Sequence, residues 1–152
     1  MTKGIKILLV DDEESFVKTL AERMHMRDAP AQVALNGEEA LQMVQAGEVP
    51  DVMVLDLRMP GIDGMEVLRR VKKQHPQVQV IVLTGHGTEK DEEEARRLGA
   101  FEYHKKPVDI DILVRDIRRA FREKIEDAMV AATFAQAGDF NDAKQIMDED
   151  KE

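Results

Sequence analysis

Short apolar runs alternate with longer amphipathic stretches along most of this chain, and this alternation limits the possible folds more than any other feature. The runs expected to form strands are residues 5–10, 31–35, 52–55, 78–83 and the weaker 101–104. Three of them are nearly continuous in Val, Ile and Leu, which is typical of parallel strands buried on both faces. Between the runs apolar residues recur at helical spacing, as in Phe16, Leu20 and Met24. The pattern predicts an α/β fold, a flavodoxin-like doubly wound sheet of five parallel strands in the order 2-1-3-4-5.

Composition and charge exclude several classes of protein. The 152 residues include no cysteine, which excludes disulfide scaffolds, thiolate zinc sites and cysteine nucleophiles. The 31 acidic residues outnumber the 22 basic ones and give a formal charge of -9, whereas non-specific nucleic-acid binding needs basic residues that neutralise phosphates. No apolar run reaches the roughly 20 residues that span a bilayer, and the first is shorter than the about 7–15 of a secretory signal. We therefore expect a soluble, cytoplasmic protein with no nucleic-acid partner and no membrane insertion.

The balance of charge changes after about residue 122. Residues 1–122 carry a net charge of -3, whereas residues 123–152, with 3 basic and 9 acidic side chains, carry -6. The last helical pattern begins near Val108 and keeps its apolar spacing to Ala135. Gly138 suits a helix C-terminus, and a second short helix is expected after it. We expect an α/β domain over 1–122 and an acidic helical extension over 123–152.

Polar residues follow four of the predicted strands. Asp11 and Asp12 follow the first strand, Asp56 the third and Thr84 the fourth, and Lys106 lies just beyond the fifth. Ligands of doubly wound sheets bind beyond the carboxyl ends of the strands, so these side chains are expected at one edge. Three crowded carboxylates repel one another unless a cation lies between them, and oxygen ligands suit Mg²⁺ and its preference for phosphate. A lysine and a hydroxyl group nearby would bind phosphoryl oxygens, so the pattern indicates phosphoryl transfer to an aspartate.

Four motifs in this order resemble those of the receiver domain of two-component response regulators. They are Leu-Leu-Val-Asp-Asp at 8–12, Leu-Asp-Leu-Arg-Met-Pro-Gly-Ile-Asp-Gly at 55–64, Val-Leu-Thr-Gly-His-Gly at 82–87 and Lys-Pro at 106–107. The resemblance covers about residues 4–122 and implies the same CheY-like fold that the alternation predicts. It makes the 1–122 region a receiver domain.

The resemblance also implies a phosphorylation site and a metal site. Asp56 is expected to accept a phosphoryl group from a sensor histidine kinase or a phosphotransfer protein. Asp12 and Asp56 are expected as direct metal ligands, Asp11 as a ligand through water, and Arg58 through its backbone carbonyl. The ion is expected to be Mg²⁺, for which Mn²⁺ can substitute.

Further residues are implied to respond to the phosphoryl group. Thr84 and Lys106 are expected to hold its oxygens, and Tyr103 matches the aromatic residue that turns inward when Thr84 moves toward the phosphate. We also expect Arg58 and His86, each two residues beyond a site residue, to line the path of the water that hydrolyses the acyl phosphate.

Several of these residues have simpler explanations. Asp11 and Asp12 could cap the first helix, because carboxylates are favoured there. Thr84 could start a helix, and Tyr103 could be ordinary core packing. The histidines have no metal-ligand spacing and are expected at the surface; they are His25, His75, His86 and His104.

The expected function is a phosphorylation-controlled switch that catalyses only its own phosphorylation and dephosphorylation. The 30 residues of 123–152 are too few for a DNA-binding output domain, so output is expected through an unidentified protein partner, with a homodimer through the last helix as one possibility. One alternative is an adaptor that works without phosphorylation. The other is a small-molecule phosphatase using Asp56, which is disfavoured because Arg58 stands where a second aspartate would act as general acid.

Overall fold

A computed structural model describes residues 4–136, and within them the five strands form one parallel sheet. The strands are β1 (Ile7–Val10), β2 (Ala31–Ala34), β3 (Val52–Leu55), β4 (Gln79–Thr84) and β5 (Glu102–Lys105). Their order is β2-β1-β3-β4-β5, so the predicted fold and strand order are confirmed. β4 begins one residue later than predicted, because the N–H of Val78 donates to the carbonyl of His75 in the preceding turn.

Helices connect the strands. They are α1 (Glu14–His25), α2 (Gly37–Gln45), α3 (Gly64–Gln74), α4 (Glu89–Arg97) and α5 (Ile110–Gln136). Of these, α2, α3 and α4 begin where the sequence provides a capping side chain. Asn36 caps α2 by accepting the N–H of Glu39, and Asp63 caps α3 by accepting the N–H of Glu66. Such caps satisfy backbone donors that have no partner within the helix.

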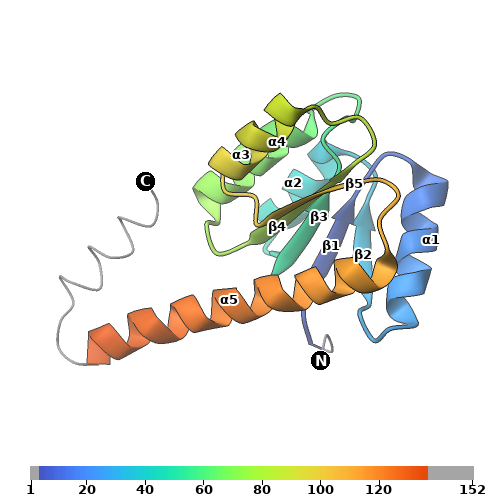
Figure 1. Ribbon diagram of the computed structural model, residues 1–152. Coiled ribbons are helices and arrows are strands. Elements are labelled where there is room, and N and C mark those ends of the chain that lie inside the picture. The colour runs from blue at the N-terminus through green and yellow to red at the C-terminus, as the bar shows by residue number, and fades with distance from the viewer. Residues whose placement is uncertain (1–3, 137–152) are drawn as a thin grey trace. The chain divides into compact units, whose positions relative to one another are not determined.

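The two faces of the sheet carry separate hydrophobic cores. In β1, Leu8 and Val10 face one core with residues of α2, α3 and α4, and Ile7 and Leu9 face the other. The second core is formed with α1 and the first part of α5 (Figure 1). Because successive side chains of a strand point to opposite faces, a strand buried on both sides must be apolar throughout. This is why β1 and β3 read as unbroken apolar runs.

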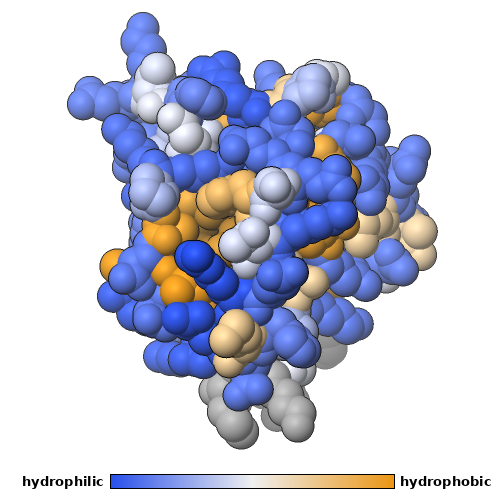
Figure 2. All heavy atoms as spheres, turned by 90° about the vertical axis from the view of Figure 1, so that its right-hand side faces the viewer, coloured by the Kyte–Doolittle hydropathy of each residue, from blue (hydrophilic) through white to orange (hydrophobic). Residues whose placement is uncertain are grey.

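The edge of the sheet at β2 is less completely covered. Ala31 and Val33 are partly exposed there, since β2 pairs only with β1. Figure 2 shows this side of the molecule, where apolar side chains are visible among hydrophilic ones. The polar residues predicted to form a site do not lie at this lateral edge. They follow the carboxyl ends of the strands.

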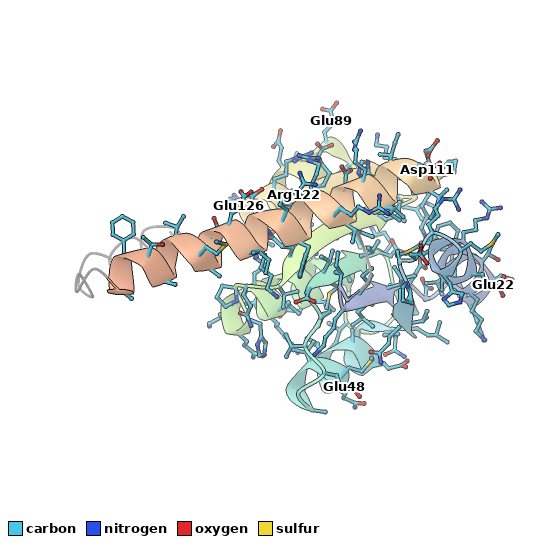
Figure 3. All side chains as sticks on the ribbon, turned by 90° about the horizontal axis from the view of Figure 1, so that it is seen from below. Glu22, Glu48, Glu89, Asp111, Arg122 and Glu126 are labelled. Atoms are coloured by element: carbon cyan, nitrogen blue, oxygen red, sulfur yellow. The ribbon has the colours of Figure 1, made fainter. Side chains whose placement is uncertain are left out.

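The chain divides into two compact units between Phe121 and Arg122, so the boundary falls within α5. Leu113, Ile117 and Ala120 of the first unit are buried, whereas Ile125 and Met129 of the second are 42% and 64% exposed. Figure 3 shows Asp111 near the start of α5 and Arg122 and Glu126 farther along it. The short helix predicted after Gly138 lies outside the described residues. No helix among residues 4–136 is both long enough and apolar enough to cross a membrane.

Candidate functional site

The backbone continues the strand pairing by one residue at the ends of β1 and β3. The N–H of Asp11 donates to the carbonyl of Ala34 at 3.1 Å, and the N–H of Asp56 donates to the carbonyl of Val10 at 3.0 Å. These bonds place both aspartates at the same edge of the sheet. The convergence expected from the parallel topology is therefore present.

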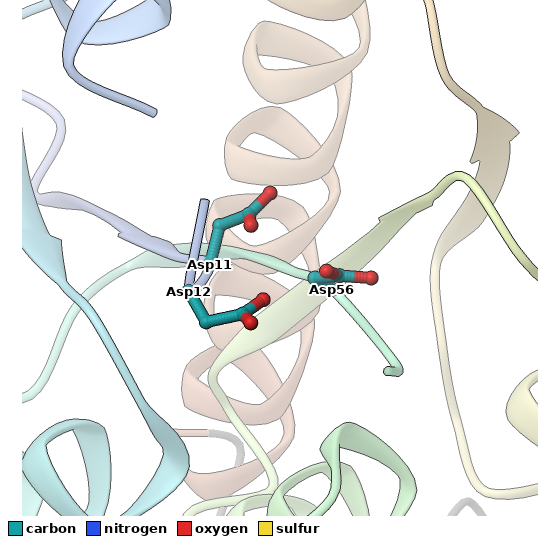
Figure 4. A group of neighbouring side chains, drawn as sticks. All are labelled: Asp11, Asp12 and Asp56. Atoms are coloured by element: carbon teal, nitrogen blue, oxygen red, sulfur yellow. The ribbon is translucent and has the colours of Figure 1, made fainter. Parts of the chain in front are cut away.

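Three carboxylates meet at this edge. One oxygen each from Asp11, Asp12 and Asp56 lies within 4.8 Å of the others, and Figure 4 shows the three side chains at the ends of their strands. Asp11 and Asp56 are each only 4% exposed, whereas Asp12 is exposed. Capping does not explain the acidic pair, because α1 begins after Glu13 and has no side-chain cap hydrogen bond.

Lys106 is the cation that contacts these carboxylates. Its Nζ lies 2.7 Å from Asp11 Oδ2, 3.6 Å from Asp56 Oδ2 and 3.1 Å from Glu13 Oε1. The same ammonium group lies 4.4 Å from the centre of the Phe16 ring. The backbone fixes this position, because the Lys106 N–H donates to the carbonyl of Thr84 at 2.9 Å. The following Lys106–Pro107 peptide bond is cis.

The charges at this edge do not balance. Burial raises the pKa of Asp11 above its usual 3.8, although the hydrogen bond from Lys106 acts in the opposite direction. Burial opposes the charge on Lys106, but its hydrogen bonds to Asp11 and Glu13 outweigh burial and raise its pKa. Among the described residues no cationic side chain contacts Asp12. A set of hard oxygen donors with an uncompensated negative charge fits a divalent cation such as Mg²⁺.

The loop after β3 is held close to Asp56 by a glycine. A Cβ on Gly64 would lie 2.0 Å from the carbonyl oxygen of Asp56, and the Gly64 N–H donates to the carbonyl of Leu57 at 3.0 Å. Within the loop, the N–H of Arg58 donates to Asp56 Oδ1 at 3.3 Å. The Arg58 guanidinium turns to α4, where it lies 2.7 Å from Asp91 Oδ2.

Thr84 and Tyr103 lie on the α4 side of the same edge. Thr84 is fully buried as the last residue of β4, and its Oγ1 accepts the N–H of His86 at 3.5 Å. It does not start a helix, because Thr88 caps α4. Tyr103 is 7% exposed, and its buried hydroxyl group has no hydrogen-bond partner among residues 4–136.

A space beside Gly87 accommodates the Tyr103 hydroxyl group. A Cβ on Gly87 would lie 1.6 Å from that hydroxyl oxygen and 2.9 Å from Cγ2 of Thr84. Tyr103 therefore points inward, toward Thr84. This orientation fits the role expected for an aromatic switch residue, and its interior position fits core packing equally well.

The sequence interpretation missed several contacts of these residues. Glu13 and Phe16 both contact Lys106, and Asp91 contacts Arg58. The pattern Thr88-Glu-Lys-Asp91 is a capping signature that identifies Asp91 as a helix-start residue but not as a partner of Arg58. The expectation of surface histidines holds for the exposed His25 and His86.

The surface expectation is wrong for His104. Its side chain is 21% exposed, and its Nε2 lies 2.7 Å from the buried Asp116 Oδ2. Its place on β5, next to the first part of α5, accounts for this burial. His75 is also only partly exposed.

Comparison with known proteins agrees with this geometry. Residues 7–118 match the response regulator receiver domain family. The chain is 37% identical over 120 residues to the DNA-binding transcriptional regulator NtrC of Escherichia coli (strain K12), a match that covers 79% of this chain and 25% of that protein. It is 38% identical over 106 residues to sporulation initiation phosphotransferase F of Bacillus subtilis (strain 168), covering 70% of this chain and 85% of that protein.

Solved structures show the same similarity. The structure of a response regulator receiver domain protein from Clostridium thermocellum has a TM-score of 0.74 and 34% sequence identity, and the match covers 79% of this chain and 96% of that one. The chain spans only about a quarter of NtrC, so the activity of that whole protein is not transferred to it. The matched family, the strand order and the residues at the sheet edge agree, and this chain belongs to the response regulator receiver domain family of two-component systems.

Proposed function

We propose that this receiver domain accepts a phosphoryl group on Asp56 from a sensor histidine kinase or a phosphotransfer protein, and that Mg²⁺ assists. The observation that carries the proposal is the position of Lys106, whose ammonium group contacts both Asp11 and Asp56 at the crowded carboxylate edge. A buried carboxylate between an acidic pair and a lysine is suited to react with an anionic phosphoryl group only if a cation reduces the repulsion.

Each residue has a defined part in this proposal. Asp12 and Asp56 would hold Mg²⁺ directly, Asp11 through water, and Arg58 through its backbone carbonyl. When bound, the ion neutralises charge on the carboxylates and on the incoming phosphoryl group. Lys106 stabilises phosphoryl oxygens by charge.

The transfer itself is a displacement at phosphorus. A carboxylate oxygen of Asp56 forms a bond to phosphorus while the phosphorus–nitrogen bond of the donor phosphohistidine breaks, and the imidazole nitrogen keeps the electron pair. Thr84, at the end of the neighbouring strand, donates a hydrogen bond from its hydroxyl group to a phosphoryl oxygen. Later attack of water at phosphorus releases inorganic phosphate and restores the Asp56 carboxylate.

The test is incubation of the full chain with Mg²⁺ and acetyl phosphate, followed by intact mass measurement. The unmodified protein should gain the mass of one phosphoryl group, and Asp56→Asn should gain none. Asp51→Asn is the matched control, because Asp51 precedes the same strand at its opposite end and lies one residue before Val52. Absence of a mass gain in the unmodified protein would refute the proposal and favour a phosphorylation-independent adaptor.

Incubation of the unmodified protein with a phosphomonoester distinguishes the proposed function from small-molecule phosphatase activity. Arg58, the residue two positions after Asp56, is engaged with Asp91 and cannot protonate a leaving alcohol at neutral pH. We therefore expect no sustained turnover of a phosphomonoester.

We propose that the second part of α5, residues 122–136, serves signal output by pairing with the same helix of a second copy of the chain. Ile125, Met129 and Val130 are 42%, 64% and 51% exposed and lie within about one turn of each other on this helix, and contiguous exposed apolar patches mark contact surfaces. Replacing Ile125 and Met129 by glutamate should halve the mass in solution if the helix pairs. An unchanged mass in solution would contradict this part of the proposal.

A further inference from the structure

Arg58 connects two parts of the molecule that lie far apart in the sequence. Its backbone N–H donates to Asp56 Oδ1 at 3.3 Å, so its main chain belongs to the loop of the phosphoacceptor. Its guanidinium donates to Asp91 Oδ2 at 2.7 Å, across 33 residues. The side chain is 53% exposed, so space allows it to move away from this partner.

Asp91, in contrast, is fixed in place. It is the third residue of α4, where its backbone N–H donates to Thr88 Oγ1 at 3.1 Å and its Oδ2 accepts the N–H of Thr88 at 3.0 Å. Its side chain is 21% exposed. The Asp91 carboxylate thus holds a half-exposed guanidinium from a position at the start of α4 that two hydrogen bonds with Thr88 fix.

A phosphoryl group on Asp56 changes the choice of partner for Arg58. The phosphoryl group carries a charge of about -1.5 to -2, and the Asp56 carboxylate loses its own charge when it is phosphorylated, so the site two residues before Arg58 becomes more negative by up to about one charge and gains phosphoryl oxygens. Guanidinium groups bind phosphoryl oxygens with two parallel hydrogen bonds, which are stronger than bonds to a single carboxylate oxygen. Since Arg58 carries one positive charge, binding of the phosphoryl group and binding of Asp91 compete.

We propose that Asp91 is a positioning residue that holds the Arg58 guanidinium on α4 and competes with the phosphoryl group on Asp56 for it. This inference rests on the proposed function, because it requires that Asp56 be the phosphoacceptor. Phosphorylation then detaches α4 from the phosphoacceptor loop by moving a single side chain. The strength of the Arg58–Asp91 pair sets part of the affinity of the site for the phosphoryl group.

The test is the affinity of the full chain for beryllofluoride, an acyl-phosphate mimic, in the presence of Mg²⁺, followed by amide NMR. Asp91→Asn keeps an oxygen that can accept the Thr88 N–H but loses the charge that holds Arg58. It should bind beryllofluoride about twofold to fivefold more tightly, the range for an exposed ion pair. Asp91→Glu restores the carboxylate and should return the affinity toward that of the unmodified protein.

Glu89→Gln is the matched control for charge. Glu89 lies in the same first turn of α4, is exposed and points away from the ribbon in Figure 3. The substitution Glu89→Gln removes the same charge as Asp91→Asn but leaves the Arg58–Asp91 pair in place, so the affinity for beryllofluoride should stay unchanged. Equal tightening in Glu89→Gln and Asp91→Asn would show a general charge effect and overturn the proposal.

The decisive comparison uses the double variant. In an Arg58→Ala background, Asp91→Asn should have no further effect on affinity, because the competed side chain is gone. Additive effects of the two substitutions, or no effect of Asp91→Asn alone, would overturn the role of Asp91 while leaving Asp56 as the phosphoacceptor. Failure of the unmodified protein to bind beryllofluoride would overturn both this inference and the proposed function.

Discussion

The buried carboxylates of this molecule, Asp116 on one side and Asp11 and Asp56 on the other, lie in surroundings of different charge. Asp116 of α5 is 1% exposed and lies 2.7 Å from His104 Nε2, 2.9 Å from Arg119 Nη1 and 3.2 Å from Arg115 Nη2. At the end of the sheet, one oxygen each from three carboxylates lies within 4.8 Å of the others, and two of the three, Asp11 and Asp56, contact the ammonium group of Lys106. Asp116 thus has three basic partners, whereas Asp11 and Asp56 share one ammonium group beside a third carboxylate, Asp12, that no cationic side chain of the described residues contacts.

The pKa values of two aspartates shift in opposite directions for this reason. Burial opposes the ionisation of Asp116, but hydrogen bonds from its basic neighbours outweigh burial and lower its pKa below 3.8. Burial raises the pKa of Asp11 above 3.8 despite the hydrogen bond from Lys106. The comparison distinguishes a buried carboxylate whose basic partners outweigh its burial from a carboxylate group with uncompensated negative charge, which a cation would balance.

Binding of Mg²⁺ should produce the largest effect, because it supplies the missing charge. At a concentration about 100 times its Kd, a ligand that binds only the folded state stabilises it by about 2.7 kcal/mol. We expect a stabilisation of this size in thermal unfolding, and a much smaller one in Asp12→Ala, which removes an exposed member of the carboxylate group. Asp116→Asn should keep the full response to Mg²⁺. An undiminished response in Asp12→Ala would show that these carboxylates do not form the metal site.

Breaking the ion cluster around Asp116 should lower the free energy of unfolding, and this effect should not depend on metal. Asp116→Asn removes a buried charge from three basic partners, and we expect the free energy of unfolding to fall by about 2 kcal/mol. Asp111→Asn on the same helix is the matched control. Asp111 pairs with Arg27 but is 76% exposed, so its loss should cost less than about 1 kcal/mol. Equal costs in denaturant unfolding would contradict the distinction between the two ion pairs.

The two aspartates should also give opposite pH dependences in metal-free protein. Because the folded-state pKa of Asp11 is raised, its contribution favours folding below pH 3.8 and is lost as pH rises through the folded-state value. Asp11→Asn should therefore gain stability relative to the unmodified protein as pH rises from 3.8 through the folded-state pKa of Asp11. The contribution of Asp116, whose pKa is lowered, is present above pH 3.8 and lost as pH falls through its folded-state value.

Denaturant unfolding in the presence of a chelator, repeated across the acidic range, measures both contributions. The stability difference between Asp116→Asn and the parent should shrink on acidification, while the difference for Asp11→Asn changes in the opposite direction. Parallel profiles for the two variants would contradict the assignment of opposite shifts.

The sequence predicted the parts of this molecule that depend on local pattern. Val10 and Leu55 end apolar runs, and the residues after them reach one sheet edge because parallel strands have their carboxyl ends on the same side. Asp11, Asp56 and Lys106 were predicted together for that reason, and their contacts agree with it. The periodicity of the sequence is sufficient to predict the position of a residue wherever a single strand or helix fixes that position.

The remaining contacts depend on how separate elements pack. His104 and Asp116 come from β5 and α5, and no spacing of residues within either element indicates that they meet. Arg58 and Asp91 are separated by 33 residues and meet only because the loop after β3 passes the start of α4. Both pairs belong to tertiary structure, which a periodic pattern does not encode.

The smallest expected effect concerns Tyr103, which lies on the α4 side of the carboxylate group. It tests whether the Tyr103 ring can change its orientation. The Tyr103 hydroxyl group is buried without a hydrogen-bond partner in the part of the chain that the structure describes, and a Cβ on Gly87 would lie 1.6 Å from it. Gly87→Ala should therefore turn the ring outward. The hydroxyl group regains water while the ring loses packing, and these opposing contributions of about 1–3 kcal/mol each should leave a net change below about 1 kcal/mol.

Tyr103 is the single tyrosine of the chain, so incorporation of fluorotyrosine gives one fluorine NMR signal that reports its orientation. The signal of Gly87→Ala should move toward that of a solvent-exposed ring. Gly85→Ala is the matched control, because a Cβ there would meet Lys106 Cδ at 3.7 Å, an ordinary contact, and the tyrosine signal should stay in place. If the signal stays unchanged in Gly87→Ala, the ring is held by its packing rather than by the space that Gly87 leaves, and Tyr103 belongs to the core instead of to a switch.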